Sequence, residues 1–206
     1  MTKIKVLIAD DHTVVRIGLR TLLSLTKDIA VVGEARNGKL AVEETLRLRP
    51  DVVIMDLAMP KLDGVEATRK ILAVAPATRI LILTSYGSSD GIAHALELGA
   101  AGAMMKTADD ERIVSAIHRI AAGSTYVSAD IQRQLKSNPP VSRLSDRQAE
   151  VLQLIVDGRT SKEIATQLGI RSDSVDAVTR SLFEKLGAAN RAEAVAIALR
   201  KHLLKI

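Results

Sequence analysis

The sequence predicts an α/β fold, namely a doubly wound parallel sheet of five strands, followed by a second, smaller all-α domain. The first observation is an alternation of short apolar runs with segments of helical spacing over residues 1–123. The second is a polar stretch that contains the adjacent Pro139 and Pro140, which forbid regular helix. The third is that only helical patterns follow this stretch. We therefore expect two domains joined by a linker.

The predicted strands are uniform runs of β-branched and long apolar residues, a pattern typical of strands buried on both faces. They cover residues 4–9, 30–33, 52–57, 79–83 and 103–105. The third run ends at Asp56 and Leu57, just before Pro60, which cannot extend a sheet ladder. Right-handed crossovers would bring the carboxyl ends of all these strands to one edge, where open α/β sheets bind their ligands.

The helices of the first domain are predicted from apolar residues three and four positions apart and from capping residues. They cover residues 13–25, 38–48, 64–75, 89–98 and 110–122. Asn37 and Asp109 are suited to cap the second and the last of them, and Ser88 with Ser89 leads into the fourth.

The domain boundaries follow from this pattern. The first domain is expected at residues 1–123, a linker with a short helix over Ser128–Leu135 at 124–143, and the second domain at 144–206. Four short helices are predicted in the second domain, capped by Ser145, Ser161, Ser172 and Asn190, and they can form a bundle with a helix-turn-helix. They cover residues 146–157, 162–168, 172–186 and 191–204.

The charge distribution favours a polyanion partner for the second domain. The 206-residue chain has a net charge of +5. Residues 1–125 hold 16 Lys and Arg against 15 Asp and Glu, a net of +1, whereas residues 126–206 hold 13 against 9, a net of +4. The alternative is that so small an excess arises by chance. With two tyrosines and one phenylalanine in the chain, base stacking is nearly excluded as a nucleic-acid mechanism.

Several classes of site and location are excluded by composition. The chain has no cysteine, which excludes disulfides and thiolate metal sites or nucleophiles. No apolar run reaches the roughly 18 residues that a membrane span requires. The N-terminus enters a predicted strand directly and shows no signal peptide. We therefore expect a cytoplasmic protein without a membrane partner.

Polar side chains from four predicted strands should meet at the carboxyl edge of the sheet. They are Asp10, Asp11, Asp56, Thr84 and Lys106. Mutual repulsion of three carboxylates is relieved either by raised pKa values or by a bound cation, and an all-oxygen ligand set with water suits Mg²⁺. Such a site could accept a phosphoryl group on Asp56, with Lys106 and Thr84 bonding its oxygens. For Asp56 alone, a solvated aspartate that merely ends a strand is equally plausible.

Two features of the sequence argue against nucleotide binding and against a catalytic histidine at this site. No Walker loop is found, so nothing is expected to cradle a nucleotide. His12 follows Asp11 directly, but we interpret it as a surface residue rather than a catalytic base.

Together these residues resemble the receiver domain of bacterial two-component response regulators, which is flavodoxin-like. The resemblance covers residues 4–122 and rests on Asp10-Asp11, Asp56-Leu57-Ala58-Met59-Pro60, Leu83-Thr84-Ser85 and Met105-Lys106. It implies that Asp56 is the phosphoacceptor, Thr84 the switch hydroxyl and Lys106 the lysine that pairs with the phosphoryl group. It further implies that Asp11, Asp56 and the Ala58 carbonyl bind Mg²⁺ directly, whereas Asp10 helps through water.

The chain departs from the receiver pattern at Ala103, where the family usually has Tyr or Phe. That ring is thought to swing inward when the switch hydroxyl moves, and alanine has no ring. Tyr86 is near but not at the matching position. Either the switch works through the helix after Tyr86 alone, or coupling is weak.

The second domain resembles the LuxR-type helix-turn-helix over about residues 143–205. The resemblance rests on the segment 144–152, on Gly158, on Ser161-Lys162-Glu163-Ile164-Ala165 and on Leu186-Gly187. Together with the receiver it is similar to a NarL/FixJ-type response regulator. The resemblance implies a transcription regulator that a partner histidine kinase phosphorylates, that dimerises when phosphorylated and that binds double-stranded promoter DNA. Helix 172–186 would enter the major groove.

The candidate DNA contacts lie on this helix and just before it. They are Lys162, Arg171, Ser174, Asp176, Ala177, Arg180, Ser181 and Lys185. Val175, Val178, Leu182 and Leu186 form an apolar stripe that would face the bundle. The family commonly has Lys at the position of Asp176 and His at that of Val178. A carboxylate there can accept from a cytosine amino group, but it opposes the attraction to phosphates that dominates affinity.

Two alternatives remain at this point. One is a phosphorylation-dependent protein-binding module with weak or vestigial DNA binding, which a gel shift on promoter DNA would distinguish. The other is a phosphatase that works through an aspartyl-phosphate. The main interpretation, by contrast, is a protein that accepts a phosphoryl group on its own aspartate and is not a turnover enzyme. Against the phosphatase, Ala58 stands two residues after Asp56 where a second carboxylate would act as acid and base.

Overall fold

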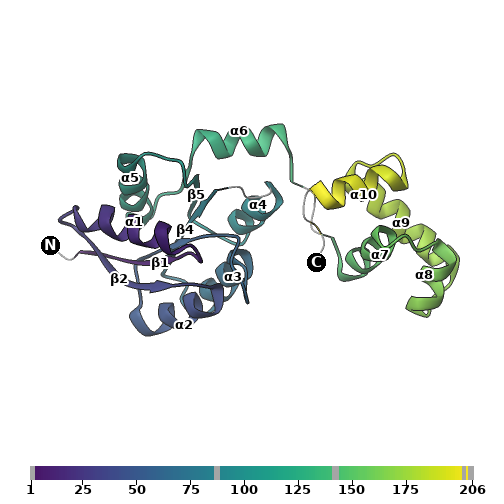
Figure 1. Cartoon of the computed structure of the whole chain (residues 1–206), viewed down its shortest axis with the longest axis horizontal. Coiled ribbons are helices and arrows are strands. Elements are labelled where there is room, and N and C mark those ends of the chain that lie inside the picture. Colours follow the sequence, from purple (N-terminus) through teal and green to yellow (C-terminus); the bar gives the residue numbers. More distant parts are fainter. Residues whose placement is uncertain (1–2, 86–88, 141–143, 201–202, 204–206) are drawn as a thin grey trace. The chain divides into compact units, whose positions relative to one another are not determined.

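The computed structural model describes residues 3–85, 89–140, 144–200 and 203 (Figure 1). The chain forms two compact units, Met1–Pro139 and Pro140–Ile206. Tyr86, Ser88, the last three residues of the expected linker and the expected end of the last helix at Leu204 lie outside the described residues. No helix in the described ranges combines the length and apolarity that a membrane crossing requires.

A parallel sheet forms the centre of the first unit. Within the described residues it has six strands in the order β2-β1-β3-β4-β5-β6. They are β1 Ile4–Ala9, β2 Ile29–Ala35, β3 Val52–Met55, β4 Arg79–Thr84, β5 Gly102–Met105 and β6 Tyr126–Val127. The first five correspond to the predicted strands, so the doubly wound α/β class is confirmed.

Helices cover both faces of this sheet (Figure 1). Helices α1 Thr13–Ser24 and α5 Asp110–Ala121 pack on one face, and α2 Gly38–Leu48, α3 Gly64–Val74 and α4 Ser89–Glu97 on the other. Asn37 and Asp109 cap α2 and α5, as expected: their side chains accept from the backbone N–H groups of Leu40 and Arg112. The helices therefore bury both faces of the sheet.

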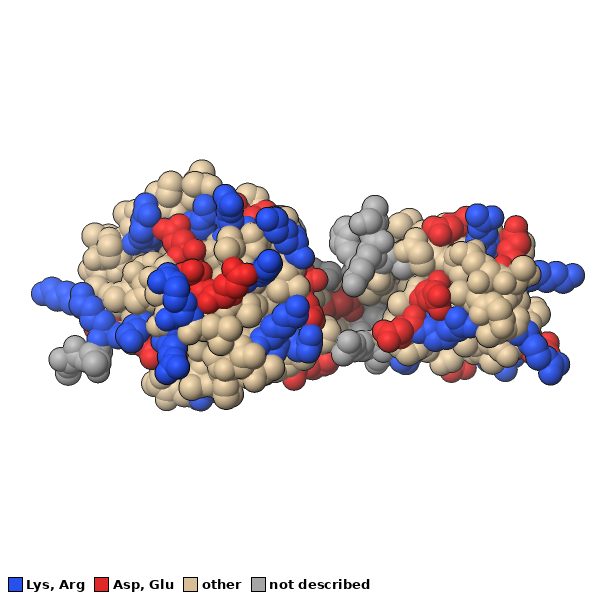
Figure 2. Space-filling model, turned by 90° about the horizontal axis from the view of Figure 1, so that it is seen from below, with Lys and Arg blue, Asp and Glu red and all other residues tan. Residues whose placement is uncertain are grey.

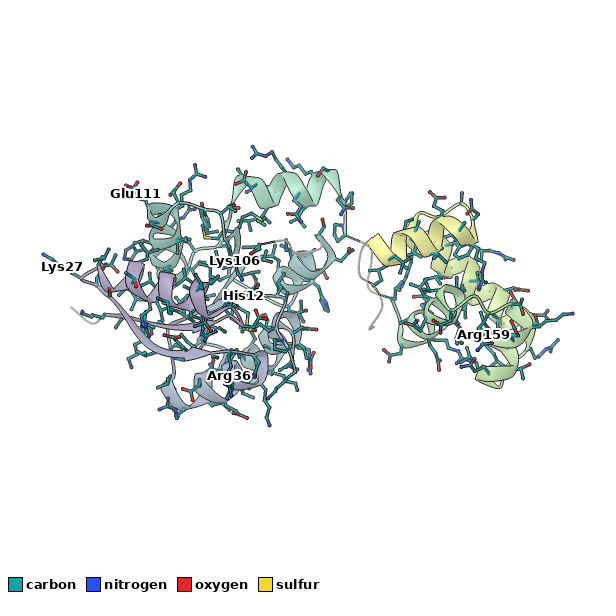
Figure 3. All side chains as sticks on the ribbon, in the orientation of Figure 1. His12, Lys27, Arg36, Lys106, Glu111 and Arg159 are labelled. Carbon is teal, nitrogen blue, oxygen red and sulfur yellow. The ribbon has the colours of Figure 1, made fainter. Side chains whose placement is uncertain are left out.

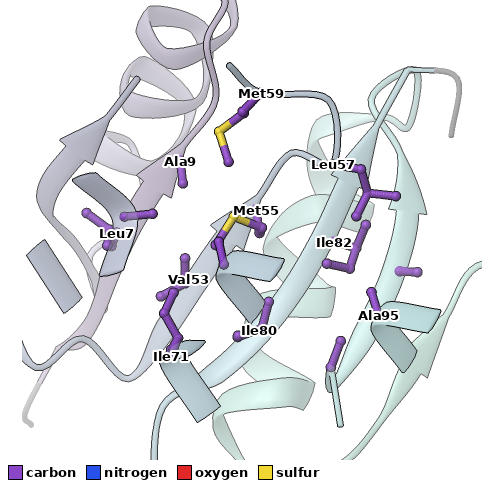
Figure 4. Close-up of a cluster of buried hydrophobic side chains, with 14 of the residues drawn as sticks. Leu7, Ala9, Val53, Met55, Leu57, Met59, Ile71, Ile80, Ile82 and Ala95 are labelled. Atoms are coloured by element: carbon purple, nitrogen blue, oxygen red, sulfur yellow. The ribbon is translucent and has the colours of Figure 1, made fainter. Parts of the chain in front are cut away.

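Alternate residues of the strands supply two separate aliphatic layers. Figure 4 shows one layer, in which Leu7 and Ala9 of β1, Val53 and Met55 of β3, and Ile80 and Ile82 of β4 meet α3 and α4 side chains. The other layer contains Val6, Ile8, Ile54, Leu81 and Leu83 against α1 and α5. Because both faces are buried, the uniform apolar runs seen in the sequence are what such strands require.

The sequence analysis missed the sixth strand, and its expected linker differs from the structure. Strand β6 pairs parallel with β5, and Gly102 permits this because an added Cβ would lie 2.3 Å from the Tyr126 carbonyl oxygen. Helix α6 Ala129–Ser137 begins near the predicted place, with Ser128 as its cap. Its Ile131 is fully buried in the core of the first unit. The first unit therefore extends to Pro139 rather than ending at 123.

The second unit is helical in its described residues. It contains α7 Asp146–Val156, α8 Ser161–Leu168, α9 Ser172–Leu186 and α10 Arg191–Arg200. Ser145 caps α7 as predicted, and the Asn190 side chain accepts from the Glu193 N–H at the start of α10. Two expected caps are wrong: Thr160, not Ser161, caps α8, and Ser172 lies inside α9, whose N-cap Arg171 makes no side-chain capping bond.

The core of the second unit confirms the predicted apolar stripe of α9. Val175, Leu182 and Leu186 are buried against residues of α7, α8 and α10, and Val178 is partly buried on the same side. Helices α8 and α9 are separated by three residues and α8 ends at the left-handed Gly169. This is the short connection that a helix-turn-helix requires.

Candidate functional site

The carboxyl ends of four strands bring the predicted polar residues to one edge of the sheet. Asp10 and Asp11 follow β1, Asp56 follows β3, Thr84 ends β4 and Lys106 follows β5. The Asp56 N–H donates to the Ala9 carbonyl at 2.8 Å, and the Lys106 N–H donates to the Thr84 carbonyl at 2.9 Å. Sheet hydrogen bonding therefore continues one residue past the strands and fixes where these side chains begin.

An ion network joins three of these residues. The Lys106 Nζ lies 2.6 Å from Asp10 Oδ2 and 3.0 Å from Asp56 Oδ2. The side chains are 9% exposed for Lys106 and 3% exposed for each aspartate, so solvent screens this contact little. One cation thus bridges two carboxylates whose residues are 46 positions apart in the chain.

Burial and charge act in opposite directions on the two central groups. Burial raises the pKa of Asp56, and the negative charge of Asp10 raises it further. The hydrogen bond to Lys106 and the positive charge of Lys106 lower this pKa. The net effect is a raised pKa of Asp56. Burial would lower the pKa of Lys106, but its hydrogen bonds to Asp10 and Asp56, and their charges, outweigh burial and raise it. Lys106 is therefore held protonated, while the ionised form of Asp56 is disfavoured.

The acidic residues lie close enough to share a metal ion. Ligand atoms of Asp10, Asp11, His12 and Asp56 all lie within 4.8 Å of one another. Asp11 Oδ1 is buried and makes no hydrogen bond, and His12 Nδ1 lies 2.7 Å from it. His12 and Lys106, both labelled in Figure 3, each lie near Asp10: His12 Nδ1 is 3.4 Å from Oδ1 and Lys106 Nζ is 2.6 Å from Oδ2. A buried carboxylate oxygen that makes no hydrogen bond and lies among other oxygen donors fits a hard divalent cation.

The loop after β3 is held close to the start of α3. The Gly64 N–H donates to the Leu57 carbonyl at 2.9 Å. An added Cβ on Gly64 would lie 2.0 Å from the Asp56 carbonyl oxygen, so only glycine permits this approach. Ala58, the residue whose carbonyl the resemblance assigns to the metal, is exposed within this loop.

Arg16 is a supporting residue that the sequence analysis missed. Its Nη1 donates to the Asp10 carbonyl at 2.8 Å and to the Asp11 carbonyl at 3.2 Å, and its Nε lies 3.2 Å from Glu34 Oε2. It therefore holds the backbone that carries two of the acidic side chains. Only its place one turn into the following helix could have indicated this role.

Ala103 lies inside the core rather than in an open slot. It is fully buried on β5, in the same cluster as Ile82, Ile92 and Ile131. Aliphatic residues from α4 and α6 thus fill the surroundings of the position where the resembled family has an aromatic ring.

The candidate DNA contacts of the second unit are exposed, but two of them also serve the fold. Exposed side chains of α8, α9 and the residue before α9 include those of Lys162, Arg171, Ser174, Asp176, Ala177 and Arg180. Ser181 and Lys185, also exposed, bond instead to the buried Gln148 of α7. The Gln148 Nε2 donates to Ser181 Oγ at 3.2 Å, and the Lys185 Nζ donates to Gln148 Oε1 at 3.0 Å.

Charges of both signs are mixed on this surface. Arg171 pairs with Asp173 at 3.2 Å, and Arg159 lies 4.0 Å from Glu163. In the view of Figure 2, basic and acidic side chains are interspersed on each unit. On the face shown, the basic side chains of the second unit are therefore interspersed with acidic ones rather than gathered into one basic field.

Comparison with known proteins adds two family matches. Residues 6–118 match the model of the response regulator receiver domain. Residues 142–198 match the model of bacterial regulatory proteins of the luxR family.

Two relatives match this chain along nearly their whole length. The chain is 37% identical over 214 residues to the oxygen regulatory protein NreC of Staphylococcus carnosus, covering 97% of this chain and 99% of that protein. It is also 37% identical to the transcriptional regulatory protein YdfI of Bacillus subtilis, with 98% of each chain covered.

Solved structures are similar along nearly the whole chain. The response regulator ChrA of a heme-sensing two-component system shares 33% identity with a TM-score of 0.59, covering 99% of this chain and 100% of that one. RcsB of Salmonella enterica serovar Typhimurium, solved on promoter DNA with the phosphomimetic BeF3−, shares 27% identity with a TM-score of 0.71, covering 95% and 98%.

Proposed function

The chain belongs to the response regulators that join a receiver domain to a luxR-type DNA-binding domain, and we propose that phosphorylation of Asp56 controls its binding to DNA. Members of this family are transcription regulators of two-component systems and not turnover enzymes, so the phosphatase alternative is set aside. The observation that carries the proposal is the contact between the nearly buried side chains of Lys106 and Asp56 at the acidic cluster.

The proposed reaction is a phosphoryl transfer to Asp56. One carboxylate oxygen of Asp56 attacks phosphorus, the bond from phosphorus to the donor atom breaks, and the donor keeps that electron pair. Lys106 is already within reach of Asp56 and can bond an oxygen of the acquired phosphoryl group. Thr84, buried at the end of the neighbouring strand, is proposed to donate its hydroxyl proton to another.

We propose Asp10, Asp11, Asp56 and the Ala58 carbonyl as the ligands of Mg²⁺. When bound, the ion would neutralise charge on the phosphoryl oxygens during transfer. The buried, unbonded Asp11 Oδ1 supports this assignment, because a carboxylate oxygen is seldom left without a partner. Asp11 is therefore expected to matter more for metal affinity than Asp10, whose Oδ2 already has Lys106.

The partners follow from the two domains. We propose a histidine kinase as the phosphoryl donor, promoter DNA as the target and a homodimer as the DNA-bound form. Among the candidate contacts, Lys162, Arg171 and Arg180 are suited to phosphates, and Ser174, Asp176 and Ala177 to base edges. Ser181 and Lys185 are proposed to position α9 through Gln148 as well as to approach DNA.

One observation favours a second candidate function. The exposed surface of α9 carries Asp173, Asp176 and Glu184, which oppose binding to a polyanion. A regulator that acts mainly by phosphorylation-dependent protein binding would tolerate them. Gel-shift titration of phosphorylated protein on its own promoter and on random duplex separates the two, because that regulator would not prefer the promoter.

The phosphoacceptor is tested by intact-protein mass. Incubation with acetyl phosphate and Mg²⁺ should add one phosphoryl group to the chain, and Asp56→Asn should abolish the addition. Asp51→Asn is a matched control, because Asp51 is an exposed aspartate before the same strand and should leave the addition unchanged. Full labelling of the Asp56→Asn variant would refute the assignment.

A further inference from the structure

We propose that His12 contributes a nitrogen ligand to the acidic pocket, so that the pocket also takes a later divalent transition-metal ion such as Co²⁺. This rests on the proposed function only in requiring that the pocket hold a divalent cation. The ligand set would then be three carboxylates, the Ala58 carbonyl and one imidazole, rather than oxygen atoms alone.

The positions of the four side-chain ligand atoms carry the proposal. His12 Nδ1 lies 2.7 Å from Asp11 Oδ1 and 3.4 Å from Asp10 Oδ1. Ligand atoms about 2.1 Å from one ion lie roughly 3.0 Å apart when adjacent and about 4.2 Å apart when opposite. The observed separations, all within 4.8 Å, fall close to this range without any backbone shift.

The contact between His12 and Asp11 is short but is not a hydrogen bond. Although the two atoms lie 2.7 Å apart, Asp11 Oδ1 makes no hydrogen bond. Two acceptor atoms in this arrangement can both direct lone pairs at a third atom, provided that the imidazole proton is on Nε2. A shared cation is the simplest such atom.

The backbone fixes His12 at the mouth of the pocket. Its N–H donates to Asp10 Oδ1 at 2.8 Å, and the residue is extended at the N-terminal end of α1. Its side chain is 66% exposed, whereas that of Asp10 is 3% exposed. The imidazole can therefore close the pocket from the solvent side, while Lys106 occupies the Oδ2 atoms of Asp10 and Asp56 on the other.

An imidazole ligand changes which ions bind well. Carboxylate, carbonyl and water oxygens suit Mg²⁺ and Mn²⁺, whereas imidazole suits later divalent ions, and the affinity of a mixed site rises from Mn²⁺ to Co²⁺. His12 should therefore strengthen Co²⁺ binding and contribute little to Mg²⁺ binding. The chain would respond to the availability of a transition ion as well as to Mg²⁺.

The test compares two ions in matched variants of the full, tag-free chain at a single pH. Calorimetric titration with Co²⁺ and Mg²⁺ is carried out on wild type, His12→Ala and the control His118→Ala. His118 faces Asp28 and is not part of the cluster. Loss of an outer-sphere partner alone weakens metal binding roughly 10- to 100-fold, so loss of a ligand should weaken Co²⁺ binding at least about tenfold. Mg²⁺ affinity should change less than about twofold in His12→Ala.

Comparing Co²⁺ with Mg²⁺ shows whether His12 binds the metal itself or only lies beside a residue that does. If His12 only orders the Asp11 carboxylate, His12→Ala will weaken Co²⁺ and Mg²⁺ alike, and the proposal is overturned. Unchanged Co²⁺ affinity would overturn it as well. The visible absorption spectrum of bound Co²⁺ should also differ between wild type and His12→Ala, and an identical spectrum would count against a nitrogen ligand.

Two further measurements guard the interpretation. His12→Asn keeps a good helix-capping residue and should also lose Co²⁺ selectivity, which excludes misfolding of the alanine variant as the cause. Phosphorylation with acetyl phosphate and Mg²⁺ should persist in His12→Ala. Its persistence together with unchanged Co²⁺ binding would overturn the His12 proposal while leaving the proposed function intact.

Discussion

At the residue scale, Asp56 is held in a site that disfavours its own charge. Burial raises the pKa of Asp56, and Lys106 offsets only part of this effect. Ionising Asp56 in this buried site is unfavourable for the metal-free protein, because no bound cation offsets the carboxylate charge. The pocket is therefore built for a charge partner that arrives from solution, which accords with a role in accepting a phosphoryl group.

We predict that Asp56→Asn stabilises the metal-free protein at neutral pH. A carboxyl group whose folded pKa is raised adds stability at pH values below the unfolded pKa, and this is lost as pH rises through the folded pKa. The advantage of the Asn variant should thus be absent near pH 4 and grow toward pH 7. Chemical denaturation in EDTA at several pH values measures it; a wild type more stable at pH 7 would contradict the prediction.

Asp176 is the second residue whose charge conflicts with its setting. It is exposed on α9 and would repel phosphates, so Asp176→Lys should strengthen DNA binding generally. Each added phosphate contact should steepen the log-log salt dependence by roughly one unit, so the gain is largest at low salt. Glu97→Lys, at an exposed residue of α4 in the first unit, is a control with the same charge change away from α9. Binding to random duplex no better than wild type would mean that α9 does not approach DNA.

Asp176 could instead read a base. If its carboxylate accepts from a cytosine amino group, Asp176→Lys should weaken binding to the true operator by about 1–3 kcal/mol while still raising non-specific binding. Titration of both duplexes at two salt concentrations distinguishes this outcome from general repulsion. We favour repulsion, because Ala177 and Val178 beside it offer no supporting polar contact.

At the element scale, α6 behaves as part of the receiver core. Ile131 is fully buried with residues of β4, β5 and α4, and Gln132 Nε2 donates to the Val127 carbonyl at 2.9 Å. The same helix ends close to the boundary with the second unit. An element that packs on β5 and α4 and precedes the DNA-binding unit is well placed to report changes at the strand ends.

We expect Ile131→Ala to destabilise the receiver unit by about 2–4 kcal/mol, as large-to-small changes in a core do. Arg133→Ala on the exposed face of the same helix should change stability by less than about 0.5 kcal/mol. Hydrogen exchange of the β5 amides in the full chain measures the stability of the receiver unit separately from that of the second unit. Equal, small effects of both changes would show that α6 is a linker after all.

At the scale of the whole molecule, two units have separate hydrophobic cores. The two clusters of the first unit and the cluster of the second share no described residue. The acidic pocket lies wholly in the first unit and the helix-turn-helix wholly in the second. Signal reception and DNA recognition therefore depend on different cores.

This division predicts which unit Mg²⁺ stabilises. At a free concentration a hundred times its dissociation constant, Mg²⁺ should stabilise the receiver unit by about 2.7 kcal/mol. Scanning calorimetry of the full chain should show one transition that moves upward with Mg²⁺ and one that stays in place. Asp11→Ala should remove most of the movement. Equal movement of both transitions would contradict independent cores.

The sequence by itself determined five of the six strands of the central sheet, most of the helix caps that it proposed and the edge on which Asp10, Asp56, Thr84 and Lys106 meet. Long apolar runs and helical spacing are local signals, and right-handed crossovers convert them into one shared edge. The apolar stripe of α9 could likewise be predicted from the sequence, because its residues recur with the period of a helix.

Only the tertiary structure decided the rest. Strand β6 is two residues long, too short to leave a periodic pattern, and it exists because Gly102 lets Tyr126 approach β5. The bond from Lys185 to Gln148 joins residues 37 positions apart, and the buried Asp11 Oδ1 beside His12 depends on the packing around it. Such contacts arise when distant segments meet in the core, so no local spacing of residues encodes them.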